Sequence, residues 1–133
     1  MTPVGLEELL RQSDIVTLHL PLDDSTRNML SAERLALMNP EAHLINMARG
    51  NLVDEGKLKE MLQHNRLAGA AFDVFAQEPP ADRELLSLPN FLVTPHIGGS
   101  TEEAILNMGL AAINGLDNAR PVQEILRELH RSL

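Results

Sequence analysis

The chain has 133 residues, 44% of them hydrophobic, which is enough for one modest core and hardly for two domains. Its net charge of −8 at pH 7 and its pI near 5.0 argue against a nucleic-acid partner, because no basic surface replaces the counterions of a phosphate backbone. The sequence has no cysteine, so disulfides, thiolate nucleophiles and thiolate metal sites are excluded.

Targeting segments and metal-binding patterns are also missing from the sequence. No two histidines stand four residues apart, the spacing that zinc enzymes use on a helix. Residues 1–10 carry two glutamates and no basic region of the kind that opens a signal peptide. No apolar run approaches the length of a membrane span. We therefore predict a soluble cytoplasmic protein with no metal, membrane or nucleic-acid partner.

Apolar runs alternate with helical patterns along the chain, which is typical of βαβ units around a mainly parallel sheet. The predicted strands are 15–20, 43–47, 67–74 and 91–94. The predicted helices are 6–12, one or two turns in 26–30, and then 32–38, 55–64, 101–116 and 122–129. Residues 78–89 are predicted as a loop. Helix 101–116 is apolar around most of its circumference, so we expect it to pack on more than the sheet.

The ends of three helices carry capping signals. Ser31 and Asp54 are predicted N-caps, and Asn65 is expected to take the left-handed conformation that closes helix 55–64. Ser100 and Glu103 have the spacing of a capping box, which predicts that the last long helix begins just after two glycines.

One histidine stands out at the end of the last predicted strand. His96 follows Pro95 and lies where open α/β sheets place their chemistry, at the carboxyl end of a strand. Gly98 and Gly99 can take positive φ, which lets the backbone approach a flat ligand closely. A turn that needs two glycines beside a surface histidine explains the same residues and stays an alternative.

Arg49, Glu78 and His96 lie at or just beyond the ends of successive strands, so a parallel sheet would bring them to one edge. An arginine fork holds a carboxylate in two hydrogen bonds, and a histidine moves a hydroxyl proton near neutral pH. An adjacent glutamate favours imidazolium and selects the tautomer. This trio predicts a proton-transfer site for a 2-hydroxy acid. A surface cation, an ordinary Glu-Pro turn and a loop histidine are the plain alternatives.

Four ordered blocks resemble the D-isomer-specific 2-hydroxyacid dehydrogenases, a family with D-3-phosphoglycerate dehydrogenase, glyoxylate/hydroxypyruvate reductase and D-lactate dehydrogenase among its members. The blocks are LHLPL at 18–22, LINMARG at 44–50, GAAFDVF at 69–75 followed by Glu78-Pro79, and TPHIGG at 94–99. The resemblance runs from about residue 6 to residue 115. Segment 98–104 is most similar to the phosphoglycerate dehydrogenase group.

The resemblance implies roles for the trio. In such enzymes the arginine of the second block binds the substrate carboxylate, the glutamate orients and charges the histidine, and the histidine is the acid/base catalyst. These roles fall on Arg49, Glu78 and His96. The similar formate dehydrogenases carry glutamine in place of this glutamate, so Glu78 favours a hydroxyacid over formate.

The resemblance also implies NAD as the cofactor and leaves NADP open, because the residue that discriminates them belongs to a strand missing here. Asp73 would contact the nicotinamide amide, and backbone near His96 and in two earlier blocks would line the ring. The implied cofactor-binding residues are His19, Leu20, Pro21, Met47, Ala48, Arg49, Asp73, His96, Gly98 and Gly99.

The sequence departs from the family in having no G-x-G-x-x-G after a strand, and no acidic residue beyond it for an adenosine ribose. The expected fold is α/β: a partial Rossmann domain, doubly wound and mainly parallel, that lacks the first βαβ unit. We place strand 15–20 third in the order 3-2-1-4-5-6, which predicts a gap between it and strand 43–47. That strand would pair directly with 43–47, take the missing half from another polypeptide, or belong to a fragment of a longer protein.

Two functions stay open on the sequence alone. The first is hydride transfer between NAD(H) and a phosphoglycerate-like or glyoxylate/hydroxypyruvate-like acid. The second is a truncated, non-catalytic paralogue that associates through helix 101–116. Residues 1–118 are expected to form the C-terminal part of the Rossmann domain, and 119–133 an amphipathic tail. The expected partners are a small 2-hydroxy acid and either a second copy in a homodimer or a complementing chain.

Overall fold

The computed structural model describes residues 3–117 and 119. They divide into two compact units, one ending at Gly98 and the other starting at Gly99. None of the described helices has the length and apolarity that crossing a bilayer requires. The predicted helix 122–129 lies outside the described residues, so the proposed tail 119–133 stays a prediction.

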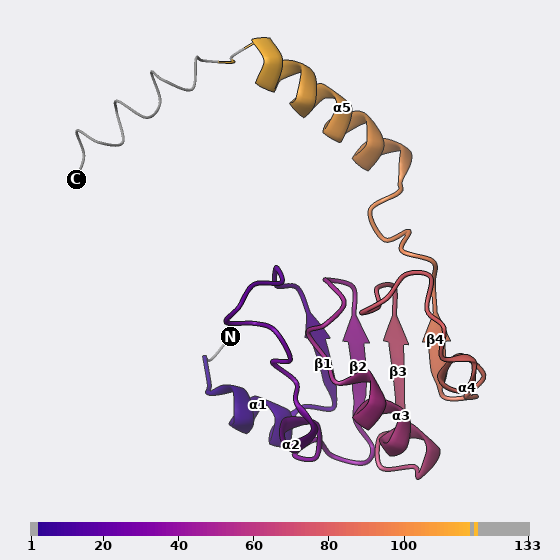
Figure 1. Cartoon of the computed structure of the whole chain (residues 1–133). Helices are drawn as coiled ribbons and strands as arrows, with labels where there is room; N and C mark the ends of the chain where they lie inside the picture. The colour runs from indigo at the N-terminus through magenta and orange to yellow at the C-terminus, as the bar shows by residue number, and fades with distance from the viewer. Residues whose placement is uncertain (1–2, 118, 120–133) are drawn as a thin grey trace. The chain divides into compact units, whose positions relative to one another are not determined.

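The first unit is built on a parallel sheet whose four strands lie in chain order (Figure 1). The strands are β1 (Ile15–Leu18), β2 (His43–Asn46), β3 (Gly69–Phe72) and β4 (Phe91–Val93). Their last residues stand opposite one another, Asn46 beside Phe72 and Phe72 beside Val93. The loops that follow the strands therefore leave the sheet at a common edge.

The predicted gap in the sheet is wrong. β1 pairs directly with β2, from Ile15 opposite His43 to Leu18 opposite Asn46. Each crossover moves the chain one strand further in the same direction, so the strand before β2 in sequence is also its neighbour in space. The direct pairing of this strand with residues 43–47, one of the expected outcomes, is what the structure shows. The expectation of a mainly parallel α/β fold is confirmed.

One helix precedes the strands of the first unit and three connect them, and one of the connecting helices was not predicted. The four are α1 (Leu6–Gln12), α2 (Ala32–Leu35), α3 (Glu55–Gln63) and α4 (Arg83–Leu86). α1 matches its predicted range, α2 is shorter than 32–38, and residues 24–28 form turns in place of the predicted helical turns at 26–30. α4 lies inside the segment that was predicted as a loop. Its N-cap is Asp82, whose carboxylate accepts hydrogen bonds from the N–H groups of Glu84 and Leu85.

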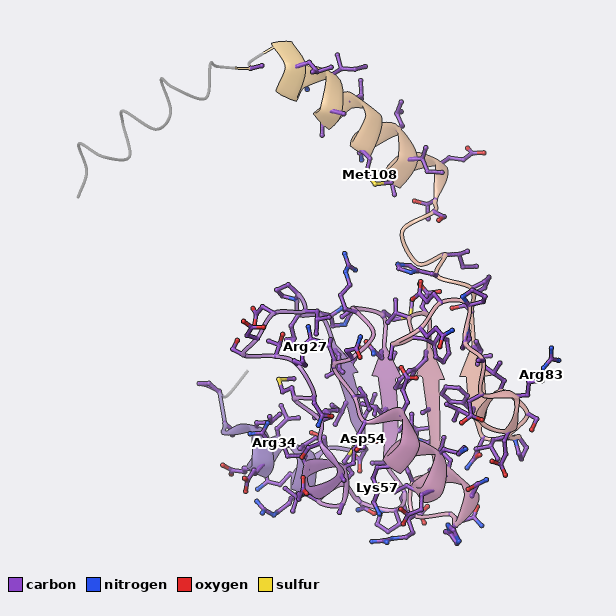
Figure 2. The ribbon with its side chains drawn as sticks, in the orientation of Figure 1. Arg27, Arg34, Asp54, Lys57, Arg83 and Met108 are labelled. Atoms are coloured by element: carbon purple, nitrogen blue, oxygen red, sulfur yellow. The ribbon has the colours of Figure 1, made fainter. Side chains whose placement is uncertain are left out.

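The predicted caps of α3 are confirmed, whereas the cap of α2 is not. Asp54 Oδ1 accepts a hydrogen bond of 2.9 Å from the Lys57 N–H at the start of α3 (Figure 2). Asn65 follows α3 with φ of 52°. Ser31 occupies the N-cap position of α2, but its hydroxyl donates to the Glu33 carboxylate at 2.6 Å and makes no cap hydrogen bond.

The second unit contains α5 (Glu102–Asp117), from which side chains such as Met108 project (Figure 2). Its cap differs from the predicted capping box. The Thr101 hydroxyl accepts a hydrogen bond of 3.1 Å from the Ala104 N–H. Thr101 directly precedes the helix, so its hydroxyl reaches the N–H three residues on. The prediction that this helix packs on more than the sheet stays a prediction.

The core of the first unit lies on one face of the sheet. Along β1 the buried residues Val16 and Leu18 alternate with exposed ones, and Ile15 is 63% exposed. Each helix contributes a fully buried leucine to that face; these are Leu10, Leu35, Leu58 and Leu85. The predicted apolar side of α3, Leu58, Met61 and Leu62, is buried. Three phenylalanine rings, Phe72, Phe75 and Phe91, pack with centroids 5.4–6.2 Å apart.

Candidate active site

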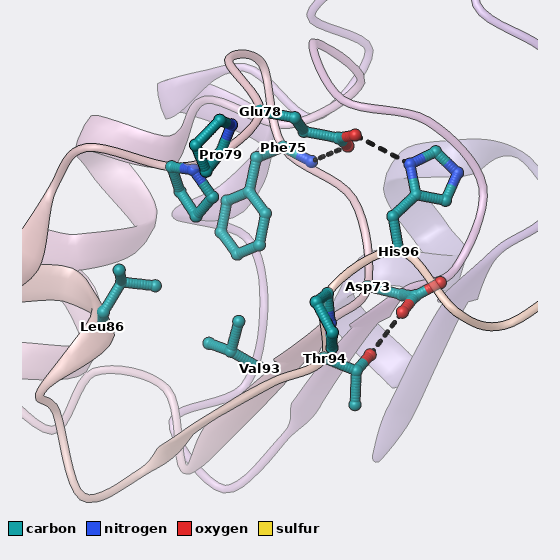
Figure 3. Close-up of a pocket in the computed structure, with 10 residues that line it drawn as sticks. Asp73, Phe75, Glu78, Pro79, Leu86, Val93, Thr94 and His96 are labelled. Carbon is teal, nitrogen blue, oxygen red and sulfur yellow. Dashed lines mark hydrogen bonds and ion pairs between the residues drawn. The ribbon is translucent and has the colours of Figure 1, made fainter.

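Two of the three predicted catalytic side chains meet at the carboxyl edge of the sheet. Glu78 lies in the loop after β3 and His96 in the loop after β4. His96 Nδ1 and Glu78 Oε2 are 2.8 Å apart (Figure 3). Their side chains are 50% and 39% exposed, so the pair is open to solvent and to a ligand.

Glu78 is fixed independently of the histidine. Its Oε1 accepts a hydrogen bond of 3.0 Å from the Phe75 N–H, while Oε2 faces the imidazole. The hydrogen bond with His96 and, after it, the one from Phe75 lower the pKa of Glu78 below its ordinary value. An ionised carboxylate only accepts hydrogen bonds, so Nδ1 of His96 carries the proton of this contact. Nε2 is then the ring nitrogen with a lone pair, which can accept a hydrogen bond.

The backbone of His96 is left-handed, with φ of 55°. Gly98 and Gly99 can take positive φ, but no described glycine adopts it. A non-glycine residue in this conformation is uncommon, although histidine tolerates it better than most. A strained backbone conformation is kept only where surrounding contacts hold it in place.

Asp73 holds the loop around His96 from the end of β3. Its side chain is 2% exposed. Oδ1 accepts hydrogen bonds from the Thr94 hydroxyl at 2.5 Å and the Ile97 N–H at 2.9 Å. Oδ2 accepts one from the Gly98 N–H at 2.8 Å. Burial acts to raise the pKa of Asp73, but the hydrogen bonds from Thr94, Gly98 and Ile97 outweigh burial and lower it below the ordinary value. The carboxylate is therefore ionised at neutral pH.

The close approach at Gly98 explains why this position lacks a side chain. A Cβ there would lie 2.8 Å from Met47 Cε and 2.9 Å from Asp73 Oδ2. A Cβ at Gly99 would meet nothing within 4 Å. Of the two glycines in the motif, Gly98 is the one that the packing requires.

The third member of the trio, Arg49, is not joined to the other two. It is exposed, and its Nη1 donates to the carbonyl of Ala48 at 2.6 Å. Asn46, which the sequence analysis did not single out, shapes this turn. Asn46 Nδ2 donates to the Arg49 carbonyl at 3.0 Å, and the Ala48 N–H donates to Asn46 Oδ1 at 3.2 Å. The signal in the sequence was a polar residue in an apolar strand run, and its side chain is buried.

The turn of Arg49 nevertheless packs on the loop of Glu78. A Cβ on Gly50 would lie 1.9 Å from the carbonyl oxygen of Phe75 and 2.6 Å from the N of Ala76. The backbones of the two loops are therefore in direct contact at Gly50. Gly50 is the last residue of the LINMARG block, and its contact with Phe75 was not predicted from the sequence.

The loop after β1 completes the edge of the sheet. His19 Nε2 and the Thr17 hydroxyl are 2.9 Å apart, and the Pro21 carbonyl accepts from the Thr26 hydroxyl at 2.8 Å. Leu20 is partly buried and Ala48 is buried. The Met47 side chain is 44% exposed. The predicted cofactor-binding residues from His19 to Gly98 thus all lie in the segments that follow the strands at this edge.

A cavity of about 380 Å³ opens beside the Glu78–His96 pair (Figure 3). Its apolar wall includes Phe75, Pro79 and Leu86, and its polar residues are Asp73, Glu78, Thr94 and His96. Within the described part of the chain, no group of three His, Asp or Glu side chains could hold a metal ion. The chemistry that this edge offers is proton transfer beside carboxylates.

Comparison with known proteins places the chain in a family. A family model for the NAD-binding domain of D-isomer specific 2-hydroxyacid dehydrogenases matches residues 1–98. The chain belongs to this family. The match ends where the first structural unit ends, at Gly98. The resemblance inferred from the four blocks, and NAD as the cofactor of this kind of domain, are confirmed.

Curated relatives of this chain are longer proteins. The glycerate dehydrogenase of Methylorubrum extorquens is 50% identical over 105 residues, covering 77% of this chain and 33% of that protein. The D-3-phosphoglycerate dehydrogenase of Methanocaldococcus jannaschii is 48% identical over 99 residues, covering 74% and 19%. The chain thus spans between a fifth and a third of the length of these relatives.

Solved dehydrogenase structures share the fold of this family member. A glyoxylate reductase from Paecilomyes thermophila has a TM-score of 0.83 at 38% identity, covering 87% of this chain and 35% of its own. An NAD-complexed D-isomer specific 2-hydroxyacid dehydrogenase from Lactobacillus delbrueckii ssp. bulgaricus has a TM-score of 0.74 at 35% identity, covering 90% and 42%. These similarities support a Rossmann-type dehydrogenase fold.

Proposed function

We propose that the protein containing this chain transfers hydride between NAD(H) and a 2-hydroxy acid, with His96 as the acid/base catalyst. The observation that carries the proposal is the 2.8 Å contact between His96 Nδ1 and the Glu78 carboxylate at the carboxyl edge of the sheet. In the oxidative direction, Nε2 of His96 takes the proton of the substrate hydroxyl. Glu78 stabilises the imidazolium that results and keeps the ring in one tautomer.

Arg49 is proposed to bind the substrate carboxylate. Its guanidinium gives one hydrogen bond to the Ala48 carbonyl and has further N–H donors for a bidentate pair. The contact of its turn with the loop of Glu78 at Gly50 supports this role, because that contact keeps the two loops together. A substrate held by its carboxylate presents the neighbouring carbon and hydroxyl to the histidine.

The residues at this edge fit the nicotinamide end of NAD, which, when bound, accepts or supplies the hydride. Asp73 Oδ2 takes one hydrogen bond, from Gly98, and a carboxylate oxygen has a second lone pair for a carboxamide N–H. The absence of a Cβ at Gly98 leaves room for its backbone to approach this oxygen. The remaining cofactor contacts in the loops after β1 and β2, and that of Gly99, stay predictions.

The finer assignments belong to the same proposal. Relatives named D-3-phosphoglycerate dehydrogenase and glycerate dehydrogenase support a phosphoglycerate-like or glyoxylate/hydroxypyruvate-like acid as substrate. Solved relatives include NAD-complexed and NADPH-complexed forms, so NAD is proposed here with NADP as the competitor to test. A homodimer or a complementing chain, and a cytoplasmic location, stay predictions.

The test uses a chimera in which residues 3–98 replace the matching segment of the glycerate dehydrogenase of Methylorubrum extorquens, which is 50% identical. The rest of that enzyme is kept. We expect the chimera to oxidise glycerate with NAD, measured by NADH absorbance. His96→Asn should lower kcat by roughly 100-fold or more, the contribution of a general acid/base. The matched control is His43→Asn, at the opposite end of β2. A folded chimera without activity, or His96→Asn with activity near that of the unsubstituted chimera, would leave the non-catalytic paralogue as the better description.

A further inference from the structure

The loop of His96 is tied to the end of β3 by one side-chain hydroxyl and two backbone N–H groups. Thr94 is the residue directly after β4, and its N–H donates to the Phe72 carbonyl at 3.0 Å. Its hydroxyl donates to Asp73 Oδ1 at 2.5 Å, joining the residue after β4 to the residue after β3. Within the described residues, this is the one side chain that donates to Asp73, since the other two donors are backbone N–H groups.

The three donors surround His96. Thr94 precedes it by two residues, while Ile97 and Gly98 follow it, and all three bind one buried carboxylate. The residue in the middle of this clamp has the left-handed φ of 55°. A left-handed backbone at a non-glycine residue relaxes unless both sides are held. The carboxylate holds the following side directly, and the Thr94 hydroxyl holds the preceding side.

The orientation of Asp73 depends on the same hydroxyl. Oδ1 divides its two lone pairs between Thr94 and Ile97, while Oδ2 faces Gly98. Without the hydroxyl, the Asp73 carboxylate loses its hydrogen bond to the residue after β4, and with it a contact that fixes the rotation of the carboxylate. The N–H groups of Ile97 and Gly98 then lose a fixed acceptor, and each gives up a hydrogen bond to a charged group.

The effect reaches the imidazole because Glu78 is anchored elsewhere. Phe75 holds Glu78 from the loop after β3, independently of the His96 loop. The two side chains meet only if both loops keep their places. We propose that Thr94 is a positioning residue, whose hydroxyl acts through Asp73 to hold His96 in hydrogen-bonding distance of Glu78. This role rests on the proposed function of His96 as acid/base catalyst.

Thr94 offers a matched pair of substitutions. Thr94→Val keeps the branched shape and removes the donor, whereas Thr94→Ser keeps the donor and removes the methyl group. A role in packing predicts that serine is the worse replacement. A role of the hydroxyl predicts that valine is the worse one.

The experiment uses the full chain and nitrogen-15 NMR, with two readouts that do not depend on turnover. The first is the signal of the His96 Nδ1–H, and the second is hydrogen exchange at the amides of Ile97 and Gly98. In Thr94→Val we expect the Nδ1–H signal to be lost to exchange and both amides to exchange about tenfold faster, as loss of one hydrogen bond predicts. Thr94→Ser should restore both readouts, and amides in α3 should not change in either variant.

Unchanged readouts in Thr94→Val, or equal loss in Thr94→Ser, would overturn the proposal. If Thr94→Val does not fold, Asp73→Asn takes its place, since an amide cannot accept from all three donors at once. Asp73→Asn should also lose the Nδ1–H signal, and a retained signal there would equally overturn the proposal. Absence of dehydrogenase activity in the chimera would end the proposed function without affecting these readouts, so the two failures are distinguishable.

Discussion

Gly50 is the residue at which the loops of Arg49 and Glu78 touch, and it gives the sharpest prediction at the scale of single residues. A methyl group there would lie 1.9 Å from the Phe75 carbonyl oxygen, so the backbone of one loop must move. We expect Gly50→Ala to lower the free energy of unfolding by about 1–3 kcal/mol, the usual cost of overpacking. Urea denaturation followed by circular dichroism measures the change.

Gly56 supplies a control of opposite sign. The same methyl group at Gly56, in the first turn of α3, would lie 3.4 Å from Asp54 Oδ1, an ordinary contact. Gly56→Ala should therefore raise the free energy of unfolding by about 0.4–1 kcal/mol, because alanine has less conformational freedom in the unfolded chain. A Gly50→Ala variant as stable as the unsubstituted chain would contradict the contact between the two loops.

The Glu78–His96 pair of the site could be predicted because the ends of strands can be recognised in the sequence. Glu78 and His96 each follow an apolar run, and parallel strands bring such positions to one edge. The clamp at Asp73 was not foreseen, since its three donors come from residues 21 to 25 positions away in the chain. The glycines of the motif allow left-handed φ, but the residue that adopts it is His96, between the three donors to Asp73. Residue type alone does not reveal which neighbour holds a strained backbone.

At the scale of elements, the N-cap of α3 carries a prediction. Asp54 Oδ1 accepts from the Lys57 N–H, one of the first N–H groups of the helix, which have no partner within it. Asp54→Ala should lower the free energy of unfolding by about 1 kcal/mol, and Asp54→Ser should recover most of it because serine also caps. The measurement is the same urea denaturation.

Ser31 is the contrasting site for that experiment. It occupies the N-cap position of α2 without making the cap hydrogen bond. Ser31→Ala should change the free energy of unfolding by less than about 0.5 kcal/mol, because no cap hydrogen bond is lost. Equal costs at Asp54 and Ser31 would mean that helix propensity, and not the cap hydrogen bond, sets the effect.

The elements that the sequence predicted well are those with a long pattern. α1 and α3 were found from apolar spacing and cap residues, and all four strands were found from apolar runs. α4 has four residues, too few to show a helical period, and it sits among prolines that are typical of a loop. Its capping residue, Asp82, was the signal that could have found it.

At the scale of the whole molecule, strand order depends on the direction of successive crossovers, which no single segment reveals. The family resemblance was assigned correctly, but β1 was placed on the wrong side of the switch point of the sheet. With β1 beside β2, the four strands form one continuous surface. Asn46 then stands between Leu18 and Phe72 in the register, which explains how a buried polar side chain comes to shape the turn of Arg49.

The two faces of this sheet differ, and two consecutive residues of β4 test the difference. Phe91 is 7% exposed and packs on the rings of Phe72 and Phe75, whereas Leu92, on the opposite face, is 66% exposed. Phe91→Ala should lower the free energy of unfolding by about 3–5 kcal/mol. Leu92→Thr should change it by less than about 0.5 kcal/mol, since little apolar surface is buried there. Urea denaturation of both variants gives the comparison. A loss at Leu92 as large as at Phe91 would show that the face of the sheet carrying Leu92 is also buried in the folded protein.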